Sequence, residues 1–236
     1  MDKELQQKYL NEIGIVVWQE RNFENLGNLD RPQISPKDSI NRKELLNKNH
    51  NQDLLDLQEQ VKTCKECALH QSRTQTVFGV GNTQSDWFII GEAPGSEEDV
   101  KGEPFVGRAG QLLNSMLLAM GLPRNEIFIA NILKCRPPNN RDPKTDEVDA
   151  CRKYLKRQLE LIKPKIILAL GRIAAQNLLK SDIPIGKMRG NSYLYPNSNL
   201  PVVVTYHPAY LLRSPREKRK VWGDLKFAMQ KYKELT

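Results

Sequence analysis

The stretch WFIIGEAPG (87–95) decides the fold, because a short apolar run ends there in a glycine-containing turn. The same arrangement, an apolar run that leads into a polar turn, recurs three times along the chain. It is found in IFIAN (127–131), IILALGR (166–172) and VVVTYHPA (202–209). Short, continuous apolar runs of this kind are typical of strands that are buried on both faces. We therefore expect strands at 87–90, 127–130, 166–170 and 202–206.

Segments with helical periodicity separate these runs. Apolar residues recur with the helical period in 110–120 and 145–162, and helices are also expected from 172 to 179 and over 217–232. Alternating strands and helices favour a parallel sheet covered on both faces. The sequence thus predicts an α/β protein of three layers, α/β/α, with a central four-stranded parallel sheet.

The first 50 residues differ from the rest. A short helix is predicted at 3–13 and a strand at 15–18, whereas residues 20–50 are polar and typical of a linker. A helix bearing Leu54, Leu57 and Val61 then leads into Cys64. We expect a partly ordered N-terminal extension, 1–50, and one domain, 51–236.

Charge is concentrated in the second part. The chain has a net charge of +8, and residues 64–236 hold 27 basic against 17 acidic residues, a net charge of +10. A concentrated positive charge is a footprint of polyanion binding, although a solvated basic surface has the same composition. Neither a run of the ~18–20 apolar residues of a membrane span nor a secretory signal is found, so we expect a cytoplasmic protein.

Three polar residues lie where predicted strands end. Glu92 follows the first strand, Asn131 the second and His207 the fourth. Ligands of open α/β sheets bind outside the carboxyl ends of the strands, so these side chains are expected to converge. Asn131 and His207 also have plain structural explanations on their own, since asparagine often ends a turn and a histidine beside Pro208 often only packs.

The four cysteines form a candidate metal site. Cys64 and Cys67 make a CxxC pair, and Cys135 and Cys151 follow singly. Four thiolates suit either zinc or an iron–sulfur cluster, and the spacing does not separate the two. Buried free cysteines are the alternative, and a thioredoxin-like redox pair is disfavoured because this CxxC precedes the first core strand.

Taken together, these motifs resemble the family 4 uracil-DNA glycosylases, the iron–sulfur branch of that superfamily. The resemblance runs over residues 64–232, through CKECALHQSRTQTVFGVGN (64–82), FIIGEAPGSEEDVKGEPFVGRAGQLLN (88–114), IFIANILKCRPPNNRDP (127–143), the Cys151 segment and HPAYLLR (207–213). It implies excision of uracil from single- or double-stranded DNA by a monomer that carries a 4Fe–4S cluster on Cys64, Cys67, Cys135 and Cys151.

The resemblance also implies roles for the pocket residues. Asn131 would read the uracil edge and Phe105 would stack on the base, although Phe105 alone would be taken for ordinary core. His207 would stabilise the negative charge that develops on the uracil as it leaves. Backbone groups of the loop that contains Gly91 and Ala93 would help to hold the base.

Activation of the attacking water is less clearly encoded. Many members of the wider superfamily have an aspartate where this chain has Ala93, as is usual for family 4. Glu92 is therefore the expected activator, with Glu98 as a second candidate.

DNA contacts are expected from basic residues around the pocket. They are Arg108, Lys134 and Arg136 beside the motifs, and Arg213 and Arg216 in RSPREKRK (213–220), with Leu211 or Leu212 as a wedge. A solvated helix start explains residues 216–220 equally well.

Three rival functions remain. One is a non-catalytic or altered-specificity nucleic-acid-binding relative that keeps the fold and the cluster. A second is the subgroup that becomes trapped covalently on DNA, whose basic insertion after the third cysteine is missing from NILKCRPPNNRDP (131–143). A third, a domain associated with a phage polymerase, predicts no different chemistry.

Overall fold

A computed structural model describes residues 51–236. The helix expected at 3–13, the strand at 15–18 and the linker at 20–50 lie outside these residues, and the domain boundary after residue 50 stays a prediction. Residues 51–63 are helical, and Leu54, Leu57 and Val61 are buried along one side of this helix, as its apolar spacing predicts.

The sheet contains the four expected strands, parallel and adjacent, and two more. Its order is β1 (Val80–Gly81), β3 (Phe128–Asn131), β2 (Trp87–Gly91), β4 (Ile166–Leu170), β6 (Pro201–Thr205) and β5 (Ser192–Leu194). β1 and β5 pair antiparallel at the two edges. They were missed because they are only two and three residues long and partly exposed, and so lack a buried apolar run.

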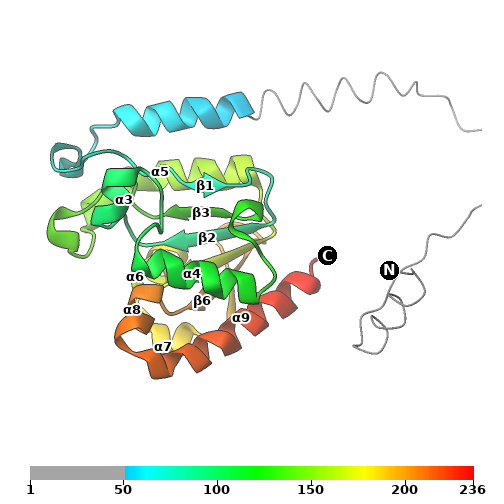
Figure 1. The fold of residues 1–236 in the computed structure, drawn as a ribbon. Coiled ribbons are helices and arrows are strands. Elements are labelled where there is room, and N and C mark those ends of the chain that lie inside the picture. The colour runs from blue at the N-terminus through cyan, green and yellow to red at the C-terminus, as the bar shows by residue number, and fades with distance from the viewer. Residues whose placement is uncertain (1–50) are drawn as a thin grey trace, which may run out of the picture. The chain divides into compact units, whose positions relative to one another are not determined.

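Helices cover both faces of the sheet, which confirms the three predicted layers (Figure 1). The helix at 51–63, α5, α6 and α7 pack on one face, and α4, α8 and α9 pack on the other. Their bounds are α3 (Ser96–Lys101), α4 (Arg108–Ala119), α5 (Thr145–Ile162), α6 (Arg172–Leu179), α7 (Ile185–Met188), α8 (Pro208–Arg213) and α9 (Lys218–Lys233). Single-turn helices lie at η1 (Ala68–Gln71), η2 (Arg124–Glu126), η3 (Pro138–Asn140) and η4 (Pro215–Glu217).

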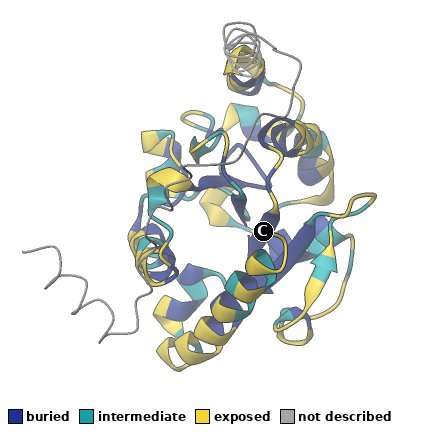
Figure 2. Ribbon diagram, turned by 90° about the vertical axis from the view of Figure 1, so that its right-hand side faces the viewer, coloured by how far each residue is buried: buried dark blue, intermediate teal, exposed yellow. Residues whose placement is uncertain are grey.

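The two faces of the sheet bury separate apolar clusters. Every residue of β2, β3, β4 and β6 is buried, whereas the helices expose their outer sides (Figure 2). Within residues 51–236, no helix is apolar over a length that would cross a membrane.

The strand order fixes where a ligand can bind. From β2 the chain first moves to β3 on one side and then crosses to β4 on the other. Such a reversal opens a crevice outside the carboxyl ends of the strands. Gly91 and Asn131 end β2 and β3, and His207 lies two residues beyond β6, so all three lie at this edge.

Candidate active site and cysteine cluster

An open cleft lies at this edge of the sheet. It brings together five residues that the sequence assigned to the site and Arg213 from the expected DNA surface. They are Glu92, Ala93, Phe105, Asn131 and His207.

Asn131 lies on the floor of the cleft and is buried. Its amide oxygen, Oδ1, is enclosed and accepts no hydrogen bond from any group of residues 51–236. A β-carbon on Gly91 would collide with this oxygen and come within 2.6 Å of Cζ of Phe105. Glycine at this position therefore lets the amide and the aromatic ring meet over the end of β2.

His207 is fixed in one tautomer by its own helix. Its Nδ1 accepts the backbone N–H of Ala209 at 3.1 Å, so the proton of the neutral ring is on Nε2. Burial lowers the pKa of His207 to about 4, with the charge of Arg213 as a smaller cause. Its ring lies 5.5 Å from that of Phe105, centroid to centroid, at 30° between planes. The cleft thus holds a neutral imidazole donor beside an aromatic face.

Glu92 directly follows β2 and carries a partly buried carboxyl group. Its pKa is raised to about 7, chiefly by burial and to a smaller extent by the charge of Asp142, against the opposing charge of Arg172. Arg172 and Asp142 form an ion pair of 2.7 Å, and among residues 51–236 no side-chain hydrogen bond to Glu92 is found. The carboxyl is therefore available to a ligand and titrates near neutral pH.

The carboxylate of Glu98 accepts hydrogen bonds from backbone N–H groups. One carboxylate oxygen accepts the N–H groups of Val106 and Gly107 at 2.9 and 3.1 Å, and the other accepts that of Gly95 at 3.1 Å. A carboxylate held in this way braces two loops and is poorly placed to take a proton from water. Of the two expected activators, the geometry favours Glu92.

The expected DNA contacts separate into three groups. Arg213 lines the cleft, whereas Arg108 and Arg216 are exposed at the starts of α4 and η4. Leu211, one of the two predicted wedge residues, is 1 % exposed because α8 turns it into the core. Its neighbour Leu212 faces solvent and is 37 % exposed.

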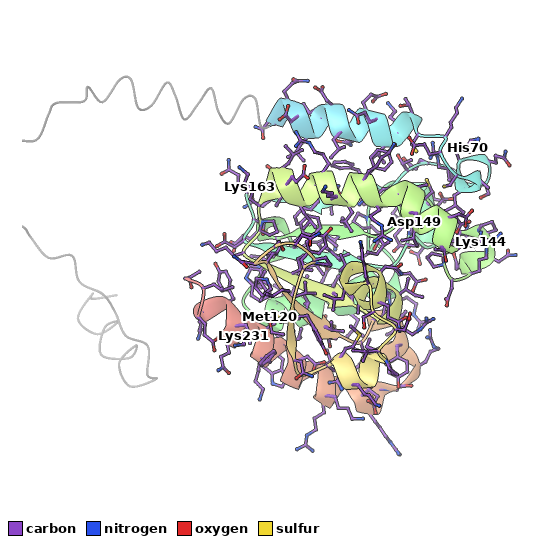
Figure 3. All side chains as sticks on the ribbon, turned by 180° about the vertical axis from the view of Figure 1, so that it is seen from behind. His70, Met120, Lys144, Asp149, Lys163 and Lys231 are labelled. Carbon is purple, nitrogen blue, oxygen red and sulfur yellow. The ribbon has the colours of Figure 1, made fainter. Side chains whose placement is uncertain are left out.

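All four cysteines line a second, small cavity. Cys64 ends the helix at 51–63, Cys67 precedes η1, Cys135 follows β3 and Cys151 lies on α5. Figure 3 shows His70 at the same end of the molecule as Lys144 and Asp149, which mark the first turns of α5. Segments far apart in the sequence therefore converge on one thiol-lined site.

Cationic and backbone donors point at this sulfur set. Arg73 donates to Sγ of Cys135 at 3.0 Å, and the backbone N–H of Lys134 donates to Sγ of Cys151 at 3.3 Å. Burial raises the pKa of the Cys151 thiol to about 12. Such donors stabilise sulfur that carries negative charge, as thiolate ligands do.

The four thiols share one cavity. Across residues 51–236, no three Cys, His, Asp or Glu side chains lie close enough together to hold one metal ion. Cys64, Cys67, Cys135 and Cys151 nevertheless line the same cavity, and four thiolates suit either zinc or an iron–sulfur cluster.

Lys134 differs from its expected role as a DNA contact. Its side chain is 1 % exposed and donates to the backbone oxygen of Asn131 at 2.9 Å and to Oε1 of Gln158 at 2.7 Å. Gln158 in turn donates to the backbone oxygen of Phe78 at 2.9 Å. Lys134 therefore joins the cysteine site to the strand that carries Asn131. The sequence holds no signal for this, because Gln158, which helps to hold the amine in the interior, lies 24 residues further along the chain.

Comparison with known proteins places this geometry in a family. The sequence model described as the uracil DNA glycosylase superfamily matches residues 78–226. The type-4 uracil-DNA glycosylase of Archaeoglobus fulgidus is 44% identical over 74% of this chain and 91% of its own length. The type-4 enzyme of Sulfurisphaera tokodaii is 44% identical over 72% of this chain and 80% of its own length. That of Thermotoga maritima is 45% identical over 66% and 81%, respectively.

The family model covers every residue that lines the cleft, together with Cys135 and Cys151, and leaves out Cys64 and Cys67. Each of these relatives is more than 40% identical to this chain over at least two thirds of the relative's own length. The chain therefore belongs to the uracil DNA glycosylase superfamily and, within it, to the type-4 uracil-DNA glycosylases.

Proposed function

We propose that this chain is a DNA repair glycosylase, which flips uracil out of DNA and hydrolyses its N-glycosidic bond to leave an abasic site. The observation that carries the proposal is the enclosed Oδ1 of Asn131, a buried acceptor that finds no donor in the described part of the chain. Buried acceptors without a partner are rare and costly. The N3–H of uracil is a donor of the right kind, and the amide N–H₂ of the same residue offers a donor to O4.

Flipping would place the base against the flat ring of Phe105 in the cleft. Extrusion costs ~a few kcal/mol of stacking and pairing, which contacts in the pocket must offset. The ring of Phe105 is buried beside Asn131 and His207, so a base that stacks on it reaches both polar side chains. The backbone at Gly91 and Ala93 leaves room for the uracil edge.

His207 supports the departure of the base. When the bond between the sugar C1′ and the uracil N1 breaks, its electron pair leaves with the base and negative charge develops on the uracil O2. A neutral imidazole with its proton on Nε2 donates a hydrogen bond to this oxygen without transferring the proton. The bond from Ala209 N–H to Nδ1 supports this tautomer.

Glu92 completes the hydrolysis. As the sugar becomes cationic, a water molecule adds to C1′ through its oxygen and gives one proton to the Glu92 carboxylate. The uracil anion takes up a proton from solvent after release. The accessible carboxyl of Glu92 and the place of this residue in the cleft support its role as proton acceptor.

Cys64, Cys67, Cys135 and Cys151 would hold a 4Fe–4S cluster, which when bound would cross-link the segments around the pocket. The DNA surface would include Arg213, together with the exposed Arg108 and Arg216. Both single- and double-stranded uracil-containing DNA are proposed substrates, bound by a monomer. We also propose that the protein acts in the cytoplasm.

Release of uracil from a labelled oligonucleotide tests the proposal. The wild-type chain should release uracil from single strands and from U·G and U·A duplexes, and hypoxanthine-containing duplexes measure its selectivity. His207→Ala should lower the single-turnover rate by about 10²–10³, and Asn131→Ala should also lose most activity. Asn177→Ala, which removes an amide on α6, should leave activity unchanged. Binding to uracil-containing DNA without base release would instead indicate the non-catalytic alternative.

A further inference from the structure

Phe105 has a backbone conformation that its own residue type disfavours. Its φ is +54°, in the left-handed region, which costs a bulky residue of order 1–3 kcal/mol. Strain of this kind persists only where the surroundings determine the conformation. The loop around Phe105 should therefore contain identifiable restraints.

Packing holds the ring of Phe105 but does not set its backbone conformation. The side chain is buried in the core cluster beside α4, and its ring stacks on that of His207. Phe105 also lines both the active-site cleft and a second open cleft that contains Lys101, Gln111 and Asn114. The left-handed peptide that presents the ring therefore needs restraints of its own.

The backbone is held from two directions. After Phe105, the carboxylate of Glu98 accepts the N–H groups of Val106 and Gly107. Before it, Nη2 of Arg124 donates to the backbone oxygen of Pro104 at 2.6 Å. The same guanidinium donates through Nη1 to Oδ1 of Asn114 at 3.1 Å.

Arg124 is well placed to transmit this restraint. It lies in η2, the single turn that leads into β3, and is partly buried in the wall of the second cleft. Asn114 lies on α4 and orients the guanidinium from behind. One side chain thus connects α4, the start of β3 and the loop that presents Phe105.

We propose that Arg124 is a positioning residue for base binding: it holds the Pro104–Phe105 peptide so that the Phe105 ring stays against the flipped base. This inference rests on the proposed glycosylase function. Arg124 itself lies outside the active-site cleft and touches no reacting atom. Its effect should therefore appear only when a base occupies the pocket.

The test compares DNA with and without a base at the target position. Arg124→Met keeps the length of the side chain and removes both hydrogen bonds. It should lower kcat/KM and the affinity for DNA carrying a non-hydrolysable uracil nucleotide by about tenfold, the scale of one base–aromatic stack. Affinity for the same DNA with a baseless tetrahydrofuran site should change less than twofold. Lys101→Met removes one cation from the same cleft without a bond to the loop, and should alter neither affinity.

A second arm tests whether Phe105 transmits the effect. In a Phe105→Ala background, Arg124→Met should cause no further loss. If Arg124→Met fails to fold, Asn114→Ala, which removes only the partner that orients the guanidinium, should show the same base-dependent loss in weaker form. Equal losses on both DNAs, or additive losses in the double variant, would overturn the inference. Failure of the wild type to release uracil would refute the proposed function instead.

Discussion

The protonation of Glu92 makes a sharp prediction about the pH dependence of catalysis. A carboxyl with a pKa of about 7 is protonated below that pH, and a protonated carboxyl cannot accept a proton from water. Its ionised fraction rises from about one tenth at pH 6 to about nine tenths at pH 8. We therefore expect kcat/KM to rise about tenfold between these values. His207 cannot cause this change, because with a pKa of about 4 it is neutral throughout the range.

Two neighbouring charges allow the assignment to be tested by the direction of a shift. Asp142→Asn removes the negative charge that raises the pKa of Glu92 and frees Arg172 from its ion pair. The acid limb of the pH profile, which is the range where kcat/KM rises with pH, should therefore move to lower pH. Arg172→Met removes the opposing positive charge, so the limb should move to higher pH. Glu92→Gln should be slow at every pH and should lack the limb altogether.

The assay is single-turnover cleavage of a uracil-containing oligonucleotide between pH 5 and pH 9 at constant ionic strength, with enzyme in excess but well below the concentration that saturates the DNA. Opposite shifts in the two charge variants would support Glu92 as the proton acceptor. An acid limb that persists in Glu92→Gln, or near-normal activity of that variant, would remove Glu92 from the mechanism.

Further predictions concern the pocket, the cysteine site and the DNA surface. Gly91→Ala should lower kcat/KM by about a hundredfold or more, because the new methyl collides with Asn131 and comes within 2.6 Å of Phe105; equal thermal melting of both proteins would show that the fold survives. Cys151→Ala should reduce the iron content and the brown colour of the purified protein, and a wild-type protein that is colourless and iron-free would contradict the cluster assignment. Arg213→Ala should weaken binding to all DNA sequences alike and lower the slope of log K against log salt by about one, measured by anisotropy titration; an unchanged slope would place Arg213 away from phosphate.

Much of the fold could be predicted because the decisive strands are buried on both faces. A strand such as β4 must then be continuously apolar, and that pattern is visible in the sequence. The edge strands β1 and β5 lack this pattern, since each needs only one partner and stays partly exposed. The position of the cleft followed from the same parallel order, because strand ends that carry Glu92, Asn131 and His207 meet at one edge.

What could not be predicted depends on orientation and distant partners. Leu211 and Leu212 are chemically alike, and only the rotation of α8 decides that the first is buried. Lys134 resembles a surface cation in the sequence, but Asn131 and Gln158 satisfy it in the interior. The role of Glu98 depends on N–H groups of a loop eight and nine residues later, which sequence pattern alone does not bring to it.

The most direct test of the account is the identity of the products made from a duplex oligonucleotide with a single uracil. Mass spectrometry should find free uracil and a strand that retains an abasic site, formed by the wild-type protein and about 10²–10³ more slowly by His207→Ala. Intact oligonucleotide after prolonged incubation with wild-type protein, or equal rates for the two proteins, would contradict it.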